Sequence, residues 1–392
     1  MLACPPQRTT RLVLKQTELL RAPAERVVYA ERRTSRPPPT THWHGPVASV
    51  RVLIVAGATE TALIPGISGA GADPAALRAV PSADLELLAR GHSVSLPTIP
   101  TTSRGTATPA LFTHAMSEML GVDVLCVDAG MGRPTRAPVI PVGSEPGRNI
   151  RAETALPNAG ALHERARALG AGLPDEHILV GETIPGGTTT AGGVLSALGE
   201  PAGVSSSLAE NPVELKRTVV DAGLAASGLQ AGEASGAPMR ALEAMGDPVL
   251  ATVAGLVEGA LEAGITVELA GGTQLGAAAA LVRHAGVQAP MRLSTTAYVR
   301  ADESADLDGM VEAFDLELTC TDPELETATH GALGGYGSGE VKEGVGMGGA
   351  VRLIADSTRS MSALRSHAAA IYDRLAGETH CGEPSESPGE RA

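Results

Sequence analysis

The stretch HILVGETIPGGTTTAGGVLSALG, residues 177–199, decides the fold. Its first four residues have the apolar, β-branched composition of a buried strand, and its last nine are typical of a helix. The segment 181–190 between them is rich in Gly and Thr. A strand that passes through such a loop into a helix is the repeating unit of a parallel α/β sheet. The sequence therefore predicts an α/β fold.

The same alternation continues on both sides of this stretch. The other strand-like runs are RVLIVA at 51–56, VDVLCVD at 122–128, ITVELA at 265–270 and the run 293–299, and the clear helical stretches are 161–169, 213–229, 248–263, 275–284 and 357–375. This order predicts a doubly wound, mostly parallel sheet with helices on both faces, plus a smaller helical part. We expect a single α/β domain at residues 50–376.

The two ends of the chain differ from this pattern. Residues 1–49 carry eight basic and three acidic residues, whereas the whole chain has a net charge of -14. They also include three consecutive prolines at 37–39, which favour an extended, unpacked chain. We expect residues 1–49 to be a disordered basic extension or the artefact of an upstream start site, and residues 377–392 to be a second disordered tail.

The composition excludes several classes of function. A net charge of -14 repels phosphate backbones, so nucleic acid is not the expected partner. No apolar run is long enough to span a membrane, and we expect no signal peptide, because the basic start of the sequence lacks an apolar segment. The four cysteines lack CxxC spacing, and the histidines are scattered, so neither disulfides nor a metal site is expected. We expect a cytoplasmic protein whose partners are small molecules.

Polar, glycine-rich loops follow four of the predicted strands. They are GATET after residue 56, AGMGRP after residue 128, the segment 181–190, and GGTQ after residue 270. Because the carboxyl ends of parallel strands share one edge of a sheet, we expect these loops to form one composite site. Asp128 could accept hydrogen bonds from ribose hydroxyls there, or it could cap the next turn. The residues expected to contact a nucleotide or base are Asp128, Glu182, Gly271, Gly272, Thr273 and Gln274.

The loop at 181–190 has the features of a phosphate site. Its glycines let the backbone approach a ligand, its threonines add donors, and the next helix presents its N-terminus. It is not a Walker A loop, because Thr188 stands where that motif has Lys. A plain helix-capping turn has the same composition. The candidate phosphate ligands are Gly186, Gly187, Thr188, Thr189, Thr190 and Lys216, the last being one of three lysines in the chain.

A second glycine-rich stretch, GYGSGEVKEGVGMGG at 335–349, surrounds Glu343. A carboxylate among small residues leaves room for a flat ligand and suits a general base. A solvated surface loop is the alternative. The stretch GISGAGA at 66–72 lacks the GxGxxG order of a dinucleotide site, and it is typical of a close-packed turn.

Several separated segments together resemble a known family. They are residues 52–72, 127–130, 181–190, 205–217, 270–274 and 335–350, and in this order they resemble the archaeal-type nicotinate mononucleotide:dimethylbenzimidazole phosphoribosyltransferases of cobalamin biosynthesis. The resemblance covers about residues 50–375. It implies a doubly wound α/β enzyme, usually a homodimer, that needs no metal or cofactor.

This resemblance also implies a reaction and its residues. The enzyme would move the phosphoribosyl group of nicotinate mononucleotide to a benzimidazole-type base, giving α-ribazole phosphate and nicotinate. Residues 186–190 would bind the phosphate with Lys216 beside it, and Glu343 would be the catalytic base. The segment KEGVGMGGA at 342–350 departs from the GEGTGA of the bacterial branch, which leaves the acceptor base open. A nucleotide-sensing protein without catalysis and a dinucleotide-dependent oxidoreductase are the alternative functions.

Overall fold

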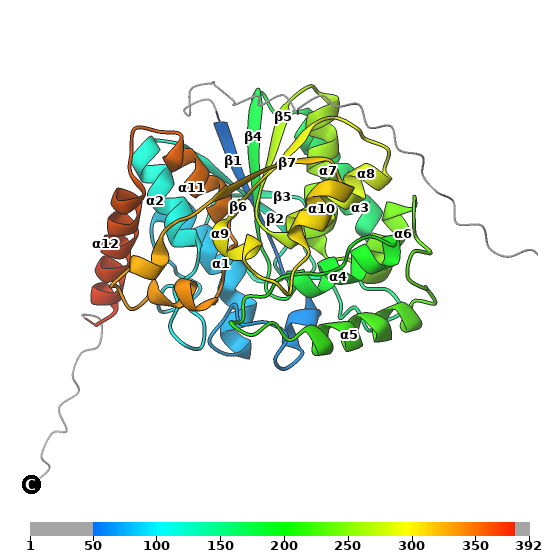
Figure 1. Cartoon of the computed structure of the whole chain (residues 1–392), viewed down its shortest axis with the longest axis horizontal. Coiled ribbons are helices and arrows are strands. Elements are labelled where there is room, and N and C mark those ends of the chain that lie inside the picture. The colour runs from blue at the N-terminus through cyan, green and yellow to red at the C-terminus, as the bar shows by residue number, and fades with distance from the viewer. Residues whose placement is uncertain (1–49, 381–392) are drawn as a thin grey trace, which may run out of the picture. The chain divides into compact units, whose positions relative to one another are not determined.

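The computed structural model describes residues 50–380 (Figure 1). The expectation for residues 1–49, and that for residues 381–392, lies outside the described residues. The last helix, α12 at Met361–His380, continues four residues past the point where we expected the second tail to begin. No helix among residues 50–380 is long and apolar enough to cross a bilayer.

The centre of the fold is a seven-stranded sheet in which every strand pair is parallel. Its spatial order is β3-β2-β1-β4-β5-β6-β7. The strands are β1 Val50–Gly57, β2 Val124–Gly130, β3 Val139–Pro141, β4 His177–Thr183, β5 Thr266–Ala270, β6 Met291–Thr296 and β7 Leu316–Thr321. The order reverses between β1 and β4, and in such sheets ligands bind at the carboxyl ends of the strands near this point.

Helices cover both faces of the sheet, as expected for a doubly wound fold (Figure 1). One face is covered by α1 (Pro74–Arg90) and α11 (Met347–Ala355), with α2 (Ala110–Leu120) and α12 outside them. The other is covered by α7 (Pro248–Glu262) and α8 (Thr273–His284), with α3 (Ala159–Ala171) and α10 (Leu307–Ala313) against them. The smaller helical part consists of α4 Gly187–Leu198, α5 Val213–Ala226 and α6 Pro238–Met245, which pack on one another.

The core is aliphatic and closely packed. The chain has only two phenylalanines, Phe112 and Phe314, and both are buried. Helices α3 and α7 approach each other through glycine: a Cβ atom on Gly255 or Gly259 would lie 2.2 or 2.0 Å from a backbone oxygen of α3. Such a short separation lets two helices exclude water without large side chains. It explains how a chain with few aromatic residues fills its interior.

Several predicted element boundaries are wrong. The run 293–299 is a strand only as far as Thr296 and continues as the short helix α9, Ala297–Arg300. Residues Glu182 and Thr183 belong to β4, so the phosphate loop is shorter than predicted. The elements β3, β7, α1, α2, α6, α10 and α11 were not predicted from the sequence. The described residues also form three short 3-10 helices: η2 at Glu60–Leu63, η3 at Leu325–Thr327 and η4 at Gly334–Ser338.

Candidate active site

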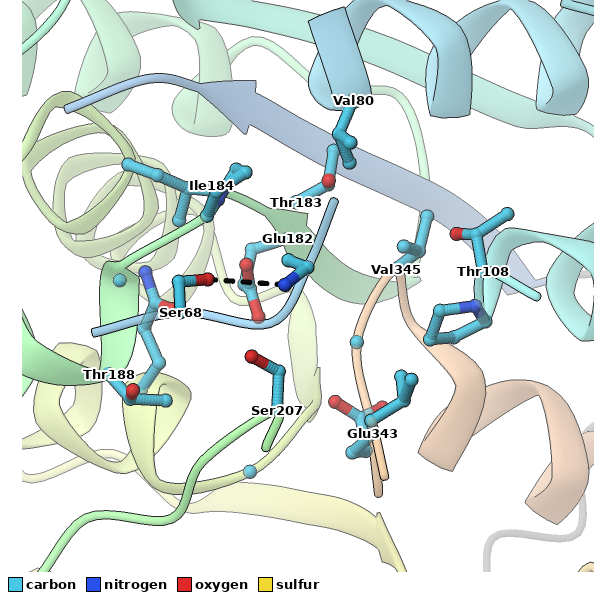
Figure 2. A pocket seen from close by; sticks show the side chains of 18 of the residues that line it. Ser68, Val80, Thr108, Glu182, Thr183, Ile184, Thr188, Ser207, Glu343 and Val345 are labelled. Atoms are coloured by element: carbon cyan, nitrogen blue, oxygen red, sulfur yellow. Dashed lines mark hydrogen bonds between the residues drawn. The ribbon is translucent and has the colours of Figure 1, made fainter. Parts of the chain in front are cut away.

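A cavity of about 850 Å³, counted with its opening to solvent, lies at the carboxyl ends of β4 and β5 (Figure 2). A volume of this order is typical of a small-molecule site. Its lining residues come from the segments 68–70, 80–84, 100–109, 182–188, 205–207, 272–274 and 341–345. We call it the transfer cavity. It brings both glycine-rich stretches of the sequence, 181–190 and 335–349, to one place.

One end of the transfer cavity is formed by the beginnings of two helices. Gly186, at φ +80°, turns the chain out of β4, and α4 starts at the next residue. The side chain of Gln274, in the first turn of α8, lies against Gly187, where an added Cβ would be 2.2 Å from it. First-turn N–H groups have no partner within their own helix, and helix N-termini attract anions. Thr188 and Thr273 supply such groups to the cavity wall.

Six of the predicted ligand residues in these two loops line the cavity, and three do not. Those on the wall are Gly186, Gly187, Thr188, Gly272, Thr273 and Gln274. Thr190 lies behind them, because its hydroxyl donates to Asp247 at 2.5 Å and to the Gly187 carbonyl at 2.8 Å. Thr189 is fully buried, and Gly271 packs on Leu275. These three residues support the wall from behind, and their contact with a ligand stays a prediction.

Lys216 lies directly behind the wall of the cavity. Its ammonium group donates to the Thr188 hydroxyl at 3.0 Å and to the Ser205 carbonyl at 2.5 Å. Burial lowers the pKa of this lysine to about 7, since an isolated charge is poorly solvated there. An anion bound at Thr188 would raise that pKa again. The predicted association of Lys216 with the phosphate loop is thus present in the structure.

Lys342, for which the sequence predicted no role, holds the opposite side of the serine loop 205–208. Its ammonium group donates to the carbonyls of Ser206 at 2.9 Å and Leu208 at 3.0 Å. Within residues 50–380, the N–H groups of Ser206 and Ser207 have no hydrogen-bond partner. Both residues line the cavity. The serine loop therefore adds free donors beside the two helix N-termini.

Glu343 lies at the other end of the cavity, on a strained loop. The residues Val341, Lys342 and Val345 have positive φ angles, between 52° and 64°, which are costly for side chains of this kind. Several hydrogen bonds hold the loop, among them one from the Val345 N–H to the Glu182 carbonyl at 2.8 Å and one from the Thr296 hydroxyl to the Lys342 carbonyl at 2.6 Å. The Glu343 carboxylate accepts the N–H of Gly348, in the first turn of α11, at 2.8 Å.

Three acidic side chains line the cavity: Asp84, Glu182 and Glu343. Burial raises the pKa of Glu343 to about 8 and that of Asp84 to about 7. Burial, and next the charge of Glu343, raise the pKa of Glu182 well above its ordinary value. Figure 2 shows Glu182 and Ser207 between Thr188 and Glu343 in this view. Groups that are poorly solvated in this way favour a positively charged or proton-donating ligand.

Several residues on this wall were not predicted from the sequence. Asp84 lies in the middle of α1, and its carboxylate accepts the hydroxyls of Thr108 and Thr183, each at 2.7 Å. The available signal was a pair of acids, Asp84 and Glu86, in the otherwise largely apolar run AALRAVPSADLELL. Ser68 comes from the stretch 66–72, which we had interpreted only as a packed turn. The threonine-rich segment 101–108 also contributes to the wall.

The expectation that four strand-end loops form one site is wrong. The loops after β4 and β5 line the transfer cavity, but those after β1 and β2 do not. Asp128, at the end of β2, accepts the N–H groups of Gly130 at 2.8 Å and Met131 at 3.0 Å. It therefore caps its own turn, which was the alternative role for it. The strand order reverses between β1 and β4. The loops after β1 and β2 therefore lie on one side of this point, and the loops after β4 and β5 lie on the other.

The fold resembles that of two solved structures. A crystal structure of the nicotinate-nucleotide-dimethylbenzimidazole phosphoribosyltransferase from Thermus thermophilus superimposes with a TM-score of 0.54 and 18% identity, over 88% of this chain and 94% of that one. A structure of CobT from the same organism gives 0.53 and 19%, over 88% and 95%. At this identity the likeness shows the fold, which is the one expected from the sequence.

Closer relatives are found by sequence, although no family model matches the chain. A UPF0284 protein of Halobacterium salinarum is 53% identical over 323 residues, which are 82% of this chain and 97% of the relative. A UPF0284 protein of Methanothermobacter thermautotrophicus is 41% identical over 306 residues, covering 75% and 84%. Sequence identity at this level, over most of this chain and most of each relative, shows that this chain and these relatives belong to one family. The chain belongs to the UPF0284 family.

Proposed function

We propose that this protein transfers the phosphoribosyl group of nicotinate mononucleotide to a nitrogen of a benzimidazole-type base. The observation that carries the proposal is that one cavity joins the free N–H donors at Thr188 and Ser206 to the carboxylate of Glu343. An enzyme for this reaction must hold a phosphate and deprotonate a flat heterocycle at the same time. The likeness of the fold to the Thermus thermophilus enzyme supports the same conclusion.

The phosphate would lie at the end formed by α4, α8 and the serine loop. There it would accept hydrogen bonds from the N–H groups of Thr188, Ser206 and Ser207 and from hydroxyls of the same loops. Lys216, behind Thr188, would add positive charge without entering the cavity. Holding the phosphate fixes the position of the sugar, so that its anomeric carbon faces the acceptor.

The transfer step would break one bond and form another at the anomeric carbon. The bond to the nicotinate nitrogen breaks, and its electron pair stays on that nitrogen, which neutralises the pyridinium ring. A nitrogen of the acceptor forms the new bond, and the proton on its other nitrogen passes to the Glu343 carboxylate. General base catalysis of this kind contributes about 10² to 10⁴ in rate.

The acidic wall suits this substrate. The nicotinate ring of the mononucleotide is cationic, and the cavity has three carboxyl groups whose ionisation is suppressed by burial, and in Glu182 also by the charges of neighbouring carboxylates. A bound cation lowers the pKa of a neighbouring carboxyl group. Binding of the substrate would therefore favour the ionised form of Glu343, which is the form that accepts a proton.

The test is a turnover assay in two variants. Purified protein is incubated with nicotinate mononucleotide and a panel of benzimidazoles, purines and phenols, and nicotinate and the ribosylated base are quantified by chromatography. We expect equal amounts of the two products, a loss of about 10² or more in turnover with Glu343→Gln, and no change with Glu153→Gln, an exposed glutamate outside the cavity. Binding of the mononucleotide without nicotinate release would instead indicate a sensing protein.

A further inference from the structure

The loops after β1 and β2 do not contribute to the proposed transfer reaction, and they line a second cavity. It encloses about 840 Å³ of empty space, counted with its opening. Its lining comes from the segments 58–63, 77–78 and 131–133 and from two prolines, Pro146 and Pro185. Strand ends next to the reversal of strand order are where α/β sheets bind ligands. We call this space the β1-β2 cavity.

The walls of the β1-β2 cavity have a fixed shape. Asp128 fixes the loop after β2 by accepting the N–H groups of Gly130 and Met131. Gly132 continues this loop at φ +67°, with Pro146 packed against it at 3.0 Å from an added Cβ. On the other wall, the Thr59 hydroxyl accepts the N–H of Thr61 and donates to the Arg148 carbonyl. The cavity is thus formed before any ligand arrives.

Most of the lining is apolar, and its charges are unbalanced. The alanines, leucines, prolines and Met131 form the body of the wall. Arg78, from α1, and Arg133, from the loop after β2, line it too, and neither has a carboxylate partner within residues 50–380. The single acid of the lining, Glu60, accepts the N–H of Asn149 at 3.3 Å.

We propose that the β1-β2 cavity binds a small aromatic molecule that carries a carboxylate or a phosphate monoester. The apolar wall would bury the ring, and the two guanidinium groups would bind the anion, since arginine forks match the geometry of both anions. Glu60 would accept a hydrogen bond from a hydroxyl or N–H on the ring. This site is separate from the transfer cavity, and the proposal does not depend on the transfer reaction.

The two cavities share a wall. Pro185 lines both of them, and Gly186 packs so closely on Ala62 that an added Cβ would lie 2.8 Å from its Cα. A ligand in the β1-β2 cavity therefore contacts the segment that leads into the phosphate loop. A binding experiment must accordingly distinguish the two sites.

Isothermal titration calorimetry with 2-naphthoate, 2-naphthyl phosphate and neutral 2-naphthol tests the proposal, at low ionic strength so that charge contacts are not screened. We expect at least one anionic probe to bind, and the double variant Arg78→Ala/Arg133→Ala to weaken it about tenfold or more. Arg165→Ala, an exposed arginine outside both cavities, should leave the affinity unchanged. The preferred probe identifies the anion.

Hydrogen-deuterium exchange locates the bound probe independently. Protection should appear at residues 58–63 and 129–133 and should be absent in the double arginine variant. The proposal is overturned if neither anionic probe binds, if 2-naphthol binds as tightly as the anions, or if the double variant keeps the wild-type affinity. Protection confined to residues 186–188, 205–207 and 272–274 also overturns it, because the probe then occupies the transfer cavity.

Discussion

Burial controls the ionisation of individual side chains around the transfer cavity. Glu343, Asp84 and Lys216 all have pKa values moved toward neutrality, in each case chiefly because the charged form is poorly solvated. Groups with pKa values near the working pH can gain and lose protons at little cost, which is what proton transfer requires. The three side chains come from the loop before α11, from α1 and from α5, so the fold gathers them from distant parts of the chain.

The raised pKa of Glu343 predicts a pH dependence of the proposed reaction. A general base acts when it is ionised, and in the free protein this carboxyl loses its proton only as the pH rises through about 8. Ionisation of Glu343 should therefore raise kcat/KM as the pH rises toward 8, by up to about tenfold per pH unit. Steady-state assays with wild type and Glu343→Gln provide the check; a flat wild-type profile over this range would contradict the role of Glu343.

Asp84 predicts a pH dependence of stability. Its pKa is 3.8 in the unfolded chain and about 7 in the fold, so between these values the unfolded state loses the proton first. The free energy of unfolding contributed by Asp84 therefore falls as the pH rises from about 4 to 7, by at most about 4 kcal/mol. Asp84→Asn should gain stability relative to wild type between about pH 5 and pH 8 in urea unfolding. The exposed Asp221→Asn should show no such gain, and an Asp84 variant that is equally destabilised at both pH values would refute this role of burial.

At the scale of elements, small residues decide how the layers pack. Gly348 and Gly349 in α11 lie on the sheet, where an added Cβ would be 2.4 Å from the Ser294 carbonyl or from the Leu179 side chain. This contact places the start of α11 against the strand ends, and Glu343 shortly before it. The glycine contact between α3 and α7 has the same effect on the other face.

The contact between α3 and α7 gives a paired prediction. In Gly259→Ala the new methyl group would lie 2.0 Å from the Arg167 carbonyl oxygen, so the helices must separate, and we expect a loss of about 1–3 kcal/mol in the free energy of unfolding. Gly160→Ala, in α3 with no atom within 4 Å, should be neutral or gain up to about 1 kcal/mol. Thermal and urea unfolding measure both; equal effects would show that helix propensity alone is responsible.

Elements with a strong local pattern were predictable from the sequence, and elements defined by their packing were not. β1, β4 and β5 are apolar runs buried in the centre of the sheet, and each was identified. β7 is LELTCT, a short, partly exposed edge strand that alternates apolar and polar residues and lacks the continuous apolar run by which the central strands were identified. α11 lies in a glycine-rich stretch that is typical of a loop, and only its contact with the sheet explains why it is a helix.

At the scale of the whole described fold, the strand order determines which loops meet. The parallel-sheet rule correctly predicted that residues 186–188 and 272–274 share one edge, and Glu343 lines the other end of the same cavity. It could not assign the loops after β1 and β2, because the sequence does not reveal where the order reverses. Asp84 was missed for a related reason: a helix residue reaches the cavity only because α1 packs beside β4.

The position of the substrate phosphate tests the central claim most directly. A crystal structure of the protein with nicotinate mononucleotide should place the phosphate within hydrogen-bonding distance of the N–H groups of Thr188 and Ser206 or Ser207, with the nicotinate ring toward Glu343. A phosphate found at Arg78 and Arg133 in the β1-β2 cavity, or a ring directed away from Glu343, would contradict the proposed reaction.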